Sequence, residues 1–286
     1  MELRHTATHE GRLSNILKED MKISTGLMNR LKRQDGIWVN GKPEHTDYPV
    51  KRGDVIALQL EEPEPEYPAE EGDLAILYED DHLLAVDKPA GMLIHPSRSK
   101  FDGTLANFVV GYYRKTGQKS AFHPVTRLDR DTFGIVLLAK NSHAHALMQQ
   151  QDLRKTYHAL VLGNWEQDAG IIDAPIARKP LPSLLREIRE DGKPSVTRFT
   201  VLERNNELCK LALEPVTGRT HQLRLHCCYR GFPILGDPQY NSPESIAKST
   251  EMGLCYQQLC AKQLKLTHPV SGLPLEILST FDISIV

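Results

Sequence analysis

The chain has 286 residues, of which 40% are hydrophobic and 25% are charged, and its formal net charge is -2. This composition is typical of a globular protein with one large core or two domains, and it excludes a chain that is disordered throughout. The start of the chain lacks the apolar segment of a secretory signal, and no apolar run approaches the roughly 18 residues that span a bilayer. The five cysteines are odd in number and lack Cys-x-x-Cys spacing, so the sequence predicts a protein of the reducing cytoplasm that does not enter a membrane.

The charge is distributed unevenly along the chain. Residues 1–60 carry ten Lys/Arg and eight Asp/Glu, residues 61–73 carry none and seven, and residues 74–286 carry 25 and 22, so the net charges are +2, -7 and +3. Outside the acidic segment the chain is mildly basic, which permits nucleic-acid binding through local patches without requiring it. Residues 61–73 also contain three prolines, which keep a chain extended, and we predict an interdomain linker there.

Residues 1–60 are predicted to form a small module of two helices and a hairpin. Apolar residues at helical spacing mark the helices, which are Leu13, Ile16 and Leu17 in the first and, after a capping Ser24, Leu27, Met28 and Leu31 in the second. The pair Asn40-Gly41, directly after Ile37–Val39, is typical of the type I′ turn of a hairpin.

Three basic residues gather at the end of the second predicted helix, namely Arg30, Lys32 and Arg33. The helix dipole favours positive charge at this position whatever the function of the protein. Charge alone therefore leaves two equal interpretations, a solvated helix end and a contact with RNA.

The remainder of the chain, residues 74–286, is predicted to be one α+β domain. The apolar patterns predict strands at 74–78, 83–86, 135–139, 157–162, 196–202 and 208–213, and helices at 104–113 and 144–153. Because strands outnumber helices and most connections are short, we expect a mixed, largely antiparallel sheet with flanking helices rather than a doubly wound parallel sheet.

One octapeptide of this domain places two acids and two arginines directly before an apolar run. It reads Arg127-Leu128-Asp129-Arg130-Asp131-Thr132-Phe133-Gly134, and Ile135–Ala139 follows. An isolated buried charge costs several kcal/mol, so charges persist beside a buried strand when they pair or have a function. The octapeptide is the first candidate for an active site, although from these residues alone an ion pair of Asp129 with Arg127 or Arg130 is the simpler explanation.

Several segments of residues 74–286 resemble, in order and in wording, the RluA family of pseudouridine synthases. The family signature His-Arg-Leu-Asp-x-x-Thr-Ser-Gly corresponds here to Thr126–Gly134. The other matching segments are Lys88–Pro96, Lys155–Val161, Gly218–His226, Gly236–Pro238 and Leu259–Ala261, the last of which precedes His268-Pro269. The resemblance implies the pseudouridine synthase fold, and it reverses the preference for a purely structural Asp129.

Residues 1–60 in turn resemble an S4 RNA-binding domain, a common companion in that family. The similar segments are Arg12–Ser14, Met28–Leu31, Val39–Lys42 and Lys51–Asp54. This resemblance favours RNA binding by Arg30, Lys32 and Arg33.

The resemblance to the RluA family implies an isomerase acting on uridine that is already part of RNA. The bond between base N1 and sugar C1′ breaks, the uracil rotates, and C5 bonds to C1′, with no cofactor or metal. The family's catalytic carboxylate corresponds to Asp129, as nucleophile or base, and Arg224 of the family's His-Gln-x-Arg motif is expected to keep it charged. Tyr157 corresponds to the active-site tyrosine, whose ring can stack on the flipped base, and Arg127 to the arginine that holds the displaced RNA.

Three further residues, Arg219, His221 and Gln222, are expected to support this site. An alternative for these three is a hydrogen-bond network that supports the sheet, and an alternative for Tyr157 is plain strand core. The run His226-Cys227-Cys228 with His221 does not match the usual spacing of zinc ligands, and adjacent cysteines on a strand would face opposite ways, so we expect no metal.

Three positions depart from the family pattern. Thr126 stands in place of the His before Arg-Leu-Asp, Phe133 in place of Ser, and Cys260 in place of the His of Leu-His-Ala. None of these positions is Asp129, Tyr157 or Arg224, so they bear on target choice or RNA grip rather than on activity.

We therefore predict a monomeric RNA pseudouridine synthase whose partner is structured RNA, with large-subunit ribosomal RNA as the first candidate and transfer RNA as the second. One alternative is a non-catalytic RNA-binding protein on the same scaffold, which would form no pseudouridine in any RNA. The other is a hydrolase of nucleosides or RNA that uses Asp129 with His221, which would release free base or broken chains.

Overall fold

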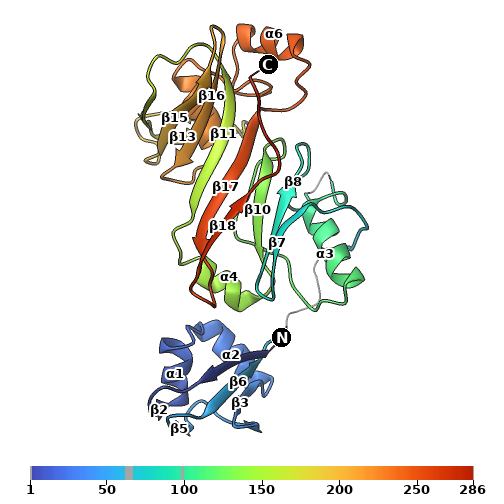
Figure 1. The fold of residues 1–286 in the computed structure, drawn as a ribbon, viewed down its shortest axis with the longest axis vertical. Helices are drawn as coiled ribbons and strands as arrows, with labels where there is room; N and C mark the ends of the chain where they lie inside the picture. The colour runs from blue at the N-terminus through green and yellow to red at the C-terminus, as the bar shows by residue number, and fades with distance from the viewer. Residues whose placement is uncertain (1, 62–66, 98–99, 286) are drawn as a thin grey trace.

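The computed structural model describes residues 2–61, 67–97 and 100–285. These residues build two main β-sheets with separate hydrophobic cores, a four-stranded sheet near the N-terminus and a ten-stranded sheet in the rest of the chain (Figure 1). No helix in the described ranges is long and apolar enough to cross a membrane.

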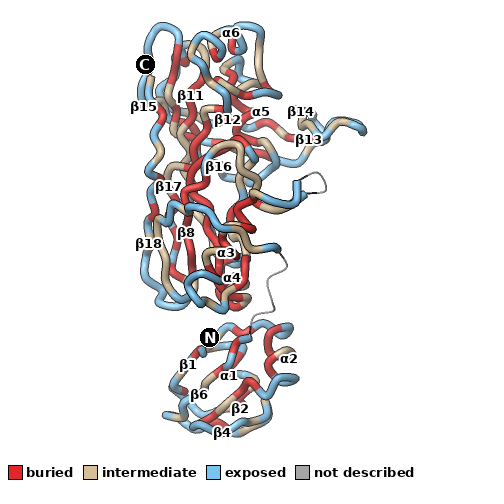
Figure 2. Tube along the Cα trace, turned by 90° about the vertical axis from the view of Figure 1, so that its right-hand side faces the viewer, coloured by how far each residue is buried: buried red, intermediate tan, exposed pale blue. Residues whose placement is uncertain are grey.

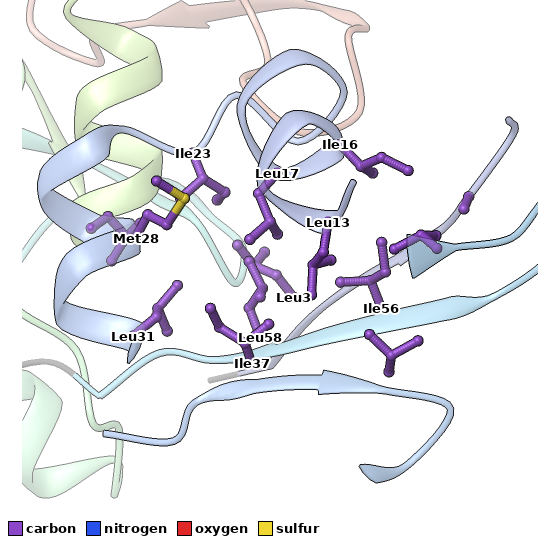
Figure 3. Close-up of a cluster of buried hydrophobic side chains, with 14 of the residues drawn as sticks. Leu3, Leu13, Ile16, Leu17, Ile23, Met28, Leu31, Ile37, Ile56 and Leu58 are labelled. Carbon is purple, nitrogen blue, oxygen red and sulfur yellow. The ribbon is translucent and has the colours of Figure 1, made fainter. Parts of the chain in front are cut away.

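The four-stranded sheet has the order β1 (Glu2–Thr6), β6 (Val55–Gln59), β3 (Ile37–Val39) and β4 (Lys42–Pro43), and short strands β2 (Gly11–Arg12) and β5 (Pro49–Val50) pair beside it. Helices α1 (Leu13–Glu19) and α2 (Thr25–Arg33) pack against this sheet. Apolar side chains of both helices meet those of β1, β3 and β6 in one cluster (Figure 3). This unit therefore has a core of its own.

The local predictions for this unit are confirmed. Ser24 caps α2, because its side chain accepts a hydrogen bond from the Leu27 backbone N at 3.2 Å. Asn40 and Gly41 have φ angles of 49° and 78°, as the type I′ turn between β3 and β4 requires. Strand β1 is not predicted from the sequence, because Leu3 is its only fully buried residue and the alternation is too weak.

The predicted linker, residues 61–73, is only partly a linker in the structure. Residues 62–66 lie outside the described residues. Tyr67 and Ala69 pack on the cluster around helix α3 (Leu105–Lys115), and the Gly103 backbone N–H donates to both oxygens of the Glu70 carboxylate, at 3.1 and 3.0 Å. The packing of the larger unit thus begins at Tyr67, a position that composition alone assigns to the acidic segment.

The ten-stranded sheet confirms the predicted mixed, largely antiparallel arrangement. Its main path is β12 (Ala169–Asp173), β15 (Val196–Arg204), β16 (Leu208–Pro215), β11 (Arg154–Leu162), β17 (Leu259–Thr267), β10 (Phe133–Ala139), β8 (Leu83–Lys88) and β7 (Ile76–Glu79). Strand β18 (Pro274–Leu278) pairs with β17, and β9 (His123–Pro124) pairs with β10. Among these pairs only β10 and β17 run parallel, over two residue pairs.

All residues of β10 are buried, and Figure 2 shows that the centre of the sheet is buried. The apolar run of β10 is continuous because both faces of the sheet are covered there. Val136 and Leu138 pack in the cluster around α3. Ile135 and Leu137 pack on the opposite side with Met148 of helix α4 (Ser142–Met148). The loop that precedes β10 is therefore attached to a rigid element.

Helices α5 (Gln222–Tyr229) and α6 (Pro243–Glu251), and a hairpin of β13 (Ile176–Arg178) and β14 (Arg186–Ile188), are not predicted from the sequence. The interpretation of Cys227 and Cys228 as neighbours on a strand is wrong, because both lie on α5. That helix buries Gln222, Arg224 and His226 beside its apolar residues, so it lacks the clean apolar stripe by which a helix is predicted. Helix α4 ends at Met148 rather than continuing to residue 153.

Candidate active site

Asp129 lies in the loop that leads into β10. A turn forms there, in which the Thr132 backbone N donates to the Asp129 carbonyl oxygen at 3.2 Å, and Gln257 Nε2 donates to Thr132 Oγ1 at 2.5 Å. Strand β10 begins with Phe133 and Gly134, and Gly134 has a φ of +103°, with an added Cβ lying 2.5 Å from the carbonyl oxygen of Ala261. Only glycine fits so close to β17. The Asp129 side chain stays 33% exposed and is thus accessible to a substrate.

The charged partner of Asp129 is Arg224 on α5. Arg224 Nη1 donates to Asp129 Oδ2 at 2.9 Å, while Nε and Nη2 donate to the two carboxylate oxygens of Asp237 at 2.7 and 2.8 Å. The Arg224 side chain is 5% exposed. Burial opposes its charge, but hydrogen bonds and charge from Asp237, and then from Asp129, raise the pKa of Arg224 above its ordinary value. The pairing predicted between Arg224 and Asp129 is thus present in the structure.

Asp237 belongs to this site, but the sequence analysis gave it no role of its own. Its side chain is fully buried, and its Oδ1 also accepts hydrogen bonds from the backbone N of Gln239 and of Tyr240, at 2.8 and 3.0 Å. The glycine before it has a φ of +74°, and a Cβ there would lie 2.1 Å from the carbonyl oxygen of Tyr256. The sequence signal was the segment Gly236–Pro238, which identifies the loop but not the function of its acid.

His221 lies beside the ion pair. It occupies the N-cap of α5 with a φ of +57°, and its Nε2 is 3.9 Å from Asp129 Oδ2. Its Nδ1 is 2.9 Å from the hydroxyl of Tyr240, whose ring also lies 5.1 Å from Arg224 Cζ. Burial lowers the pKa of His221, and the Arg224 charge adds to this against the opposing Asp129 charge, so the imidazole is neutral at pH 7.

Tyr157 reaches the same region from β11. It lies opposite Ala261 of β17, which in turn lies opposite Gly134 of β10, so the three residues form one line across the sheet. The register shifts between Thr156 and Tyr157, a β-bulge of the kind that redirects a side chain. Burial, together with the Asp129 charge, raises the pKa of Tyr157 to about 12, so the phenol is protonated at neutral pH.

Lys88 is a second residue that the sequence reasoning missed. Its side chain is fully buried, and Nζ donates to the carbonyl oxygens of Pro89, Met92 and Arg130, each at 2.9 Å. Burial lowers the pKa of Lys88 to about 8, against the opposing charges of Asp131 and Asp129. The ammonium thus ties the backbone of the loop that carries Asp129 to the segment after β8.

The alternative ion pairs of the octapeptide are not the ones that form. Arg130 donates to Asp131, from Nε to Oδ1 at 2.8 Å and from Nη2 to Oδ2 at 3.0 Å. Arg127 is exposed, and its side chain has no ion pair with Asp129. Asp129 is therefore held from α5 and not by its neighbours in the sequence.

The other predicted supporting residues have different surroundings. Gln222 is buried, and both ends of its amide are engaged, with Oε1 accepting from Thr217 Oγ1 and the Arg219 backbone N and Nε2 donating to the Val196 carbonyl and Thr197 Oγ1. Arg219 is exposed, and its Nε donates to the Pro194 carbonyl at 3.2 Å. Gln222 therefore takes part in a hydrogen-bond network that supports the sheet, the alternative stated for it above. Among the described residues, neither Gln222 nor Arg219 has a hydrogen bond or ion pair with Asp129.

The three departures from the family pattern contribute to the packing and hydrogen bonding of strands β10 and β17. Thr126 Oγ1 accepts a hydrogen bond from the Leu137 backbone N at 2.9 Å. Phe133 and Cys260 lie directly opposite each other on β10 and β17, within one apolar cluster, and the Phe133 ring meets that of Phe281 at 5.5 Å between centroids. Two of the departures thus form a single apolar contact.

The predicted basic cluster belongs to the smaller unit and does not join the Asp129 site. Lys32 and Arg33 are exposed at the end of α2. Arg30 Nη2 donates to Ser142 Oγ at the start of α4, at 2.7 Å. As for metals, the described residues contain no group of three or more His, Cys, Asp or Glu side chains that could hold an ion.

Several known proteins are similar in sequence to this chain over most of its length. A family model described as RNA pseudouridylate synthase matches residues 82–229. The RNA pseudouridine synthase YjbO of Bacillus subtilis is 35% identical over 88% of this chain and 89% of its own. Ribosomal large subunit pseudouridine synthase C of Vibrio vulnificus is 34% identical over 93% and 88%, and synthase D of Nitrosomonas europaea is 40% identical over 76% and 64%.

Among solved structures, human RNA Pseudouridylate Synthase Domain Containing 1 has a TM-score of 0.60 and 27% identity, over 75% of this chain and 86% of that one. The fold is thus the pseudouridine synthase fold. In it, Asp129 of the loop before β10 pairs with Arg224 of α5. The chain belongs to the RNA pseudouridylate synthase family. It is an isomerase that converts uridine in RNA to pseudouridine.

Proposed function

We propose that this enzyme acts on large-subunit ribosomal RNA and that Asp129 is its catalytic carboxylate. The ion pair of Asp129 with Arg224 carries the residue assignment, because it places an accessible carboxylate against a buried cation. The names of two relatives, ribosomal large subunit pseudouridine synthases C and D, support the choice of RNA.

In this proposal Arg224 holds the carboxylate of Asp129 in a fixed orientation. The guanidinium is itself immobilised by Asp237 through two parallel hydrogen bonds, so its third bond points in a defined direction. Because the bond engages Oδ2 and a third of the Asp129 side chain is exposed, the carboxylate can approach the sugar of a bound uridine, as nucleophile or as base.

Tyr157 supplies the aromatic surface in this proposal. The uracil must leave its stack before the glycosidic bond can break, which costs a few kcal/mol, and a stacked ring returns part of that. A neutral phenol suits this role, because it adds no negative charge beside Asp129. Arg127, exposed next to the catalytic loop, is then placed to hold the displaced RNA.

We further infer that residues 1–60 are an RNA-binding module similar to an S4 domain. Exposed Lys32 and Arg33 offer phosphate contacts, and an alignment that covers 93% of this chain with synthase C of Vibrio vulnificus must include most of this module. A ribosomal RNA substrate would place the enzyme in the cytoplasm.

The test of the proposed function is a map of pseudouridines in cellular RNA. Ribosomal RNA and transfer RNA from cells lacking the gene are compared with those from cells complemented by the wild-type protein, by Asp129→Asn, or by Asp81→Asn at an exposed acid in the turn between β7 and β8. We expect at least one position in large-subunit ribosomal RNA to be restored by the wild type and by Asp81→Asn, but not by Asp129→Asn. Restoration only in transfer RNA would overturn the choice of substrate.

A further inference from the structure

A chain of hydrogen bonds runs from the backbone of β14 through Tyr240 to His221, beside Asp129. The Arg186 backbone N donates to the Tyr240 hydroxyl at 2.8 Å, and that hydroxyl lies 2.9 Å from His221 Nδ1. On the other side of the imidazole ring, His221 Nε2 is 3.9 Å from Asp129 Oδ2. The imidazole thus lies between a phenol and the proposed catalytic carboxylate.

The direction of the hydrogen bond between Tyr240 and His221 follows from what the phenol can offer. A tyrosine hydroxyl has one hydrogen to donate. The oxygen already accepts from Arg186 N, and in the described part of the chain the hydroxyl has no other partner than His221 Nδ1. Burial raises the pKa of Tyr240, so the hydroxyl keeps its hydrogen. The hydroxyl therefore donates to Nδ1, because the reverse direction would leave the buried phenol hydrogen without an acceptor.

This direction fixes the position of the hydrogen on His221. A neutral imidazole carries one ring hydrogen, so one nitrogen donates and the other accepts. Burial lowers the pKa of His221 and keeps the ring neutral. Because Nδ1 accepts, the hydrogen lies on Nε2, which is the nitrogen that faces Asp129. His221 thus presents an N–H donor to the carboxylate.

Arg224 and His221 approach the same oxygen of Asp129. Arg224 Nη1 donates to Oδ2 at 2.9 Å, and His221 Nε2 faces this oxygen from the N-cap of α5. Among the described residues, Asp129 Oδ1 has no hydrogen-bond partner. A carboxylate oxygen can accept two hydrogen bonds, and active-site hydrogen bonds are often long before substrate binds.

We propose that His221 is a positioning residue whose Nε2–H closes on Asp129 Oδ2 when RNA binds. His221 and Arg224 then hold Oδ2 together, and Oδ1 is left to meet the sugar of the uridine. The Tyr240 hydroxyl keeps the imidazole in the required orientation. This proposal rests on the proposed function, since it assumes that Asp129 is the reacting carboxylate.

The kinetic test compares two amides in place of His221, with large-subunit ribosomal RNA from cells that lack the gene as substrate. Glutamine carries its amide nitrogen close to the position of Nε2, whereas asparagine reaches only as far as Nδ1. His221 has a φ of +57°, a conformation that asparagine adopts more readily than glutamine. Backbone strain alone would therefore favour His221→Asn, whereas the proposal predicts that His221→Gln is the faster enzyme.

We expect His221→Asn to lower kcat about 30-fold and His221→Gln about threefold, because only the asparagine variant loses the donor to a charged acceptor. KM should stay within about twofold of the wild type in both variants, since the contact is made to Asp129 and not to RNA. Equal kcat values in the two variants, or a faster His221→Asn, would overturn the proposal. So would a raised KM at an unchanged kcat.

Tyr240→Phe tests whether the phenol acts through His221. This substitution removes the hydroxyl but keeps the ring, which lies 5.1 Å from Arg224 Cζ. We expect kcat to fall about fivefold, with no further loss when Tyr240→Phe is added to His221→Asn. The matched control is Tyr78→Phe, which removes a hydroxyl that donates to Asp80 Oδ2 at 2.6 Å, and it should match the wild type. Losses that multiply in the double variant would overturn the proposed chain.

The NMR spectrum of the histidine ring nitrogens provides a measurement that needs no turnover. The full-length protein is isotopically labelled at these nitrogens, and the His221 signals are identified by their loss in His221→Gln. We expect a protonated Nε2 and an unprotonated Nδ1, with an Nε2 signal that shifts in Asp129→Asn but not in the exposed Asp81→Asn. A hydrogen on Nδ1, or an Nε2 signal that ignores Asp129→Asn, would overturn the proposal.

Failure of the proposed function would look different. A wild-type enzyme that forms no pseudouridine in this RNA would contradict the proposed substrate, and an active Asp129→Asn would contradict the catalytic assignment. The ring-nitrogen signals would in either case still decide where the hydrogen of His221 lies and whether it faces Asp129, because they do not depend on the RNA.

Discussion

Arg224 shares its guanidinium between two carboxylates of different character, the buried Asp237 and the partly exposed Asp129. Asp237 takes two of its hydrogen bonds, at 2.7 and 2.8 Å, and Asp129 takes one, at 2.9 Å. The Asp237 side chain is fully buried whereas that of Asp129 is 33% exposed. We infer that Asp237 fixes the orientation of Arg224, and that Arg224 in turn orients Asp129, the carboxylate proposed to act on RNA.

Replacing Asp237 by Asn should therefore lower kcat by about 10-fold to 100-fold, because Arg224 loses its fixed orientation. RNA affinity should change little, because the Asp237 side chain is fully buried and does not meet RNA. The variant should also unfold more easily, by ~3 kcal/mol, since a buried cation loses a partner. Single-turnover assays, RNA binding and urea unfolding measure the three quantities. Asp81→Asn at an exposed acid is the control, and an unchanged kcat in Asp237→Asn would refute the positioning role.

Replacing Asp129 by Asn should abolish isomerisation and leave folding and RNA affinity nearly intact, since shape is kept and only the charge is lost. Loss of a nucleophile or base usually costs several orders of magnitude in rate. Turnover above about 1% of wild type, measured by pseudouridine formation, would move the catalytic assignment to Asp131, the next carboxylate in the loop.

Arg224→Lys should lower kcat far more than expected for a substitution that retains the positive charge. An ammonium cannot reproduce the planar fork that binds Asp237 while a third nitrogen reaches Asp129. We expect a kcat at least about 100-fold lower, with RNA affinity retained. Arg219→Lys, at an exposed arginine before the same helix, is the matched control, and equal effects of the two substitutions would contradict the special position of Arg224.

Acid stability should depend on His143 of α4. Burial lowers its pKa from 6.5 to about 4, and the nearby His82 adds to the effect. Between these values the unfolded chain binds a proton that the folded protein does not, so the free energy of unfolding should fall by up to ~1.4 kcal/mol per pH unit as the pH drops from 6.5 toward 4. His143→Gln should flatten this dependence in urea unfolding at several pH values. The exposed His45→Gln should not, and an equal slope in all three proteins would disprove the assignment.

Removal of residues 1–60 should weaken RNA binding and its salt dependence more than it harms the chemical step. The two units have separate hydrophobic clusters, so the larger one should still fold, while phosphate contacts from exposed Lys32 and Arg33 are lost. Affinity and salt slope measured before and after truncation decide this. Values identical to those of the full-length protein would mean that the module does not help to bind this RNA.

Local features of this protein were predictable from its sequence. Ser24 at the start of α2, Asn40-Gly41 at a hairpin turn and the apolar run of β10 depend on neighbouring residues, whose preferences act over a few positions. Asp129 could be proposed as the catalytic carboxylate from the residues of its motif, because the resemblance to a family supplies information that hydrophobic periodicity does not contain.

Other features were decided only by tertiary structure. The partner of Asp129 is 95 positions away in the chain, and Asp237, Tyr240 and Lys88 became part of the site through sheet register and helix packing, which no local pattern encodes. Helix α5 was not predicted, because its buried face carries Gln222, Arg224 and His226, and polar residues at buried positions erase the periodicity that marks a helix. The sequence thus determined which residues are available, and the long-range packing of α5 against the loop before β10 determined which of them meet.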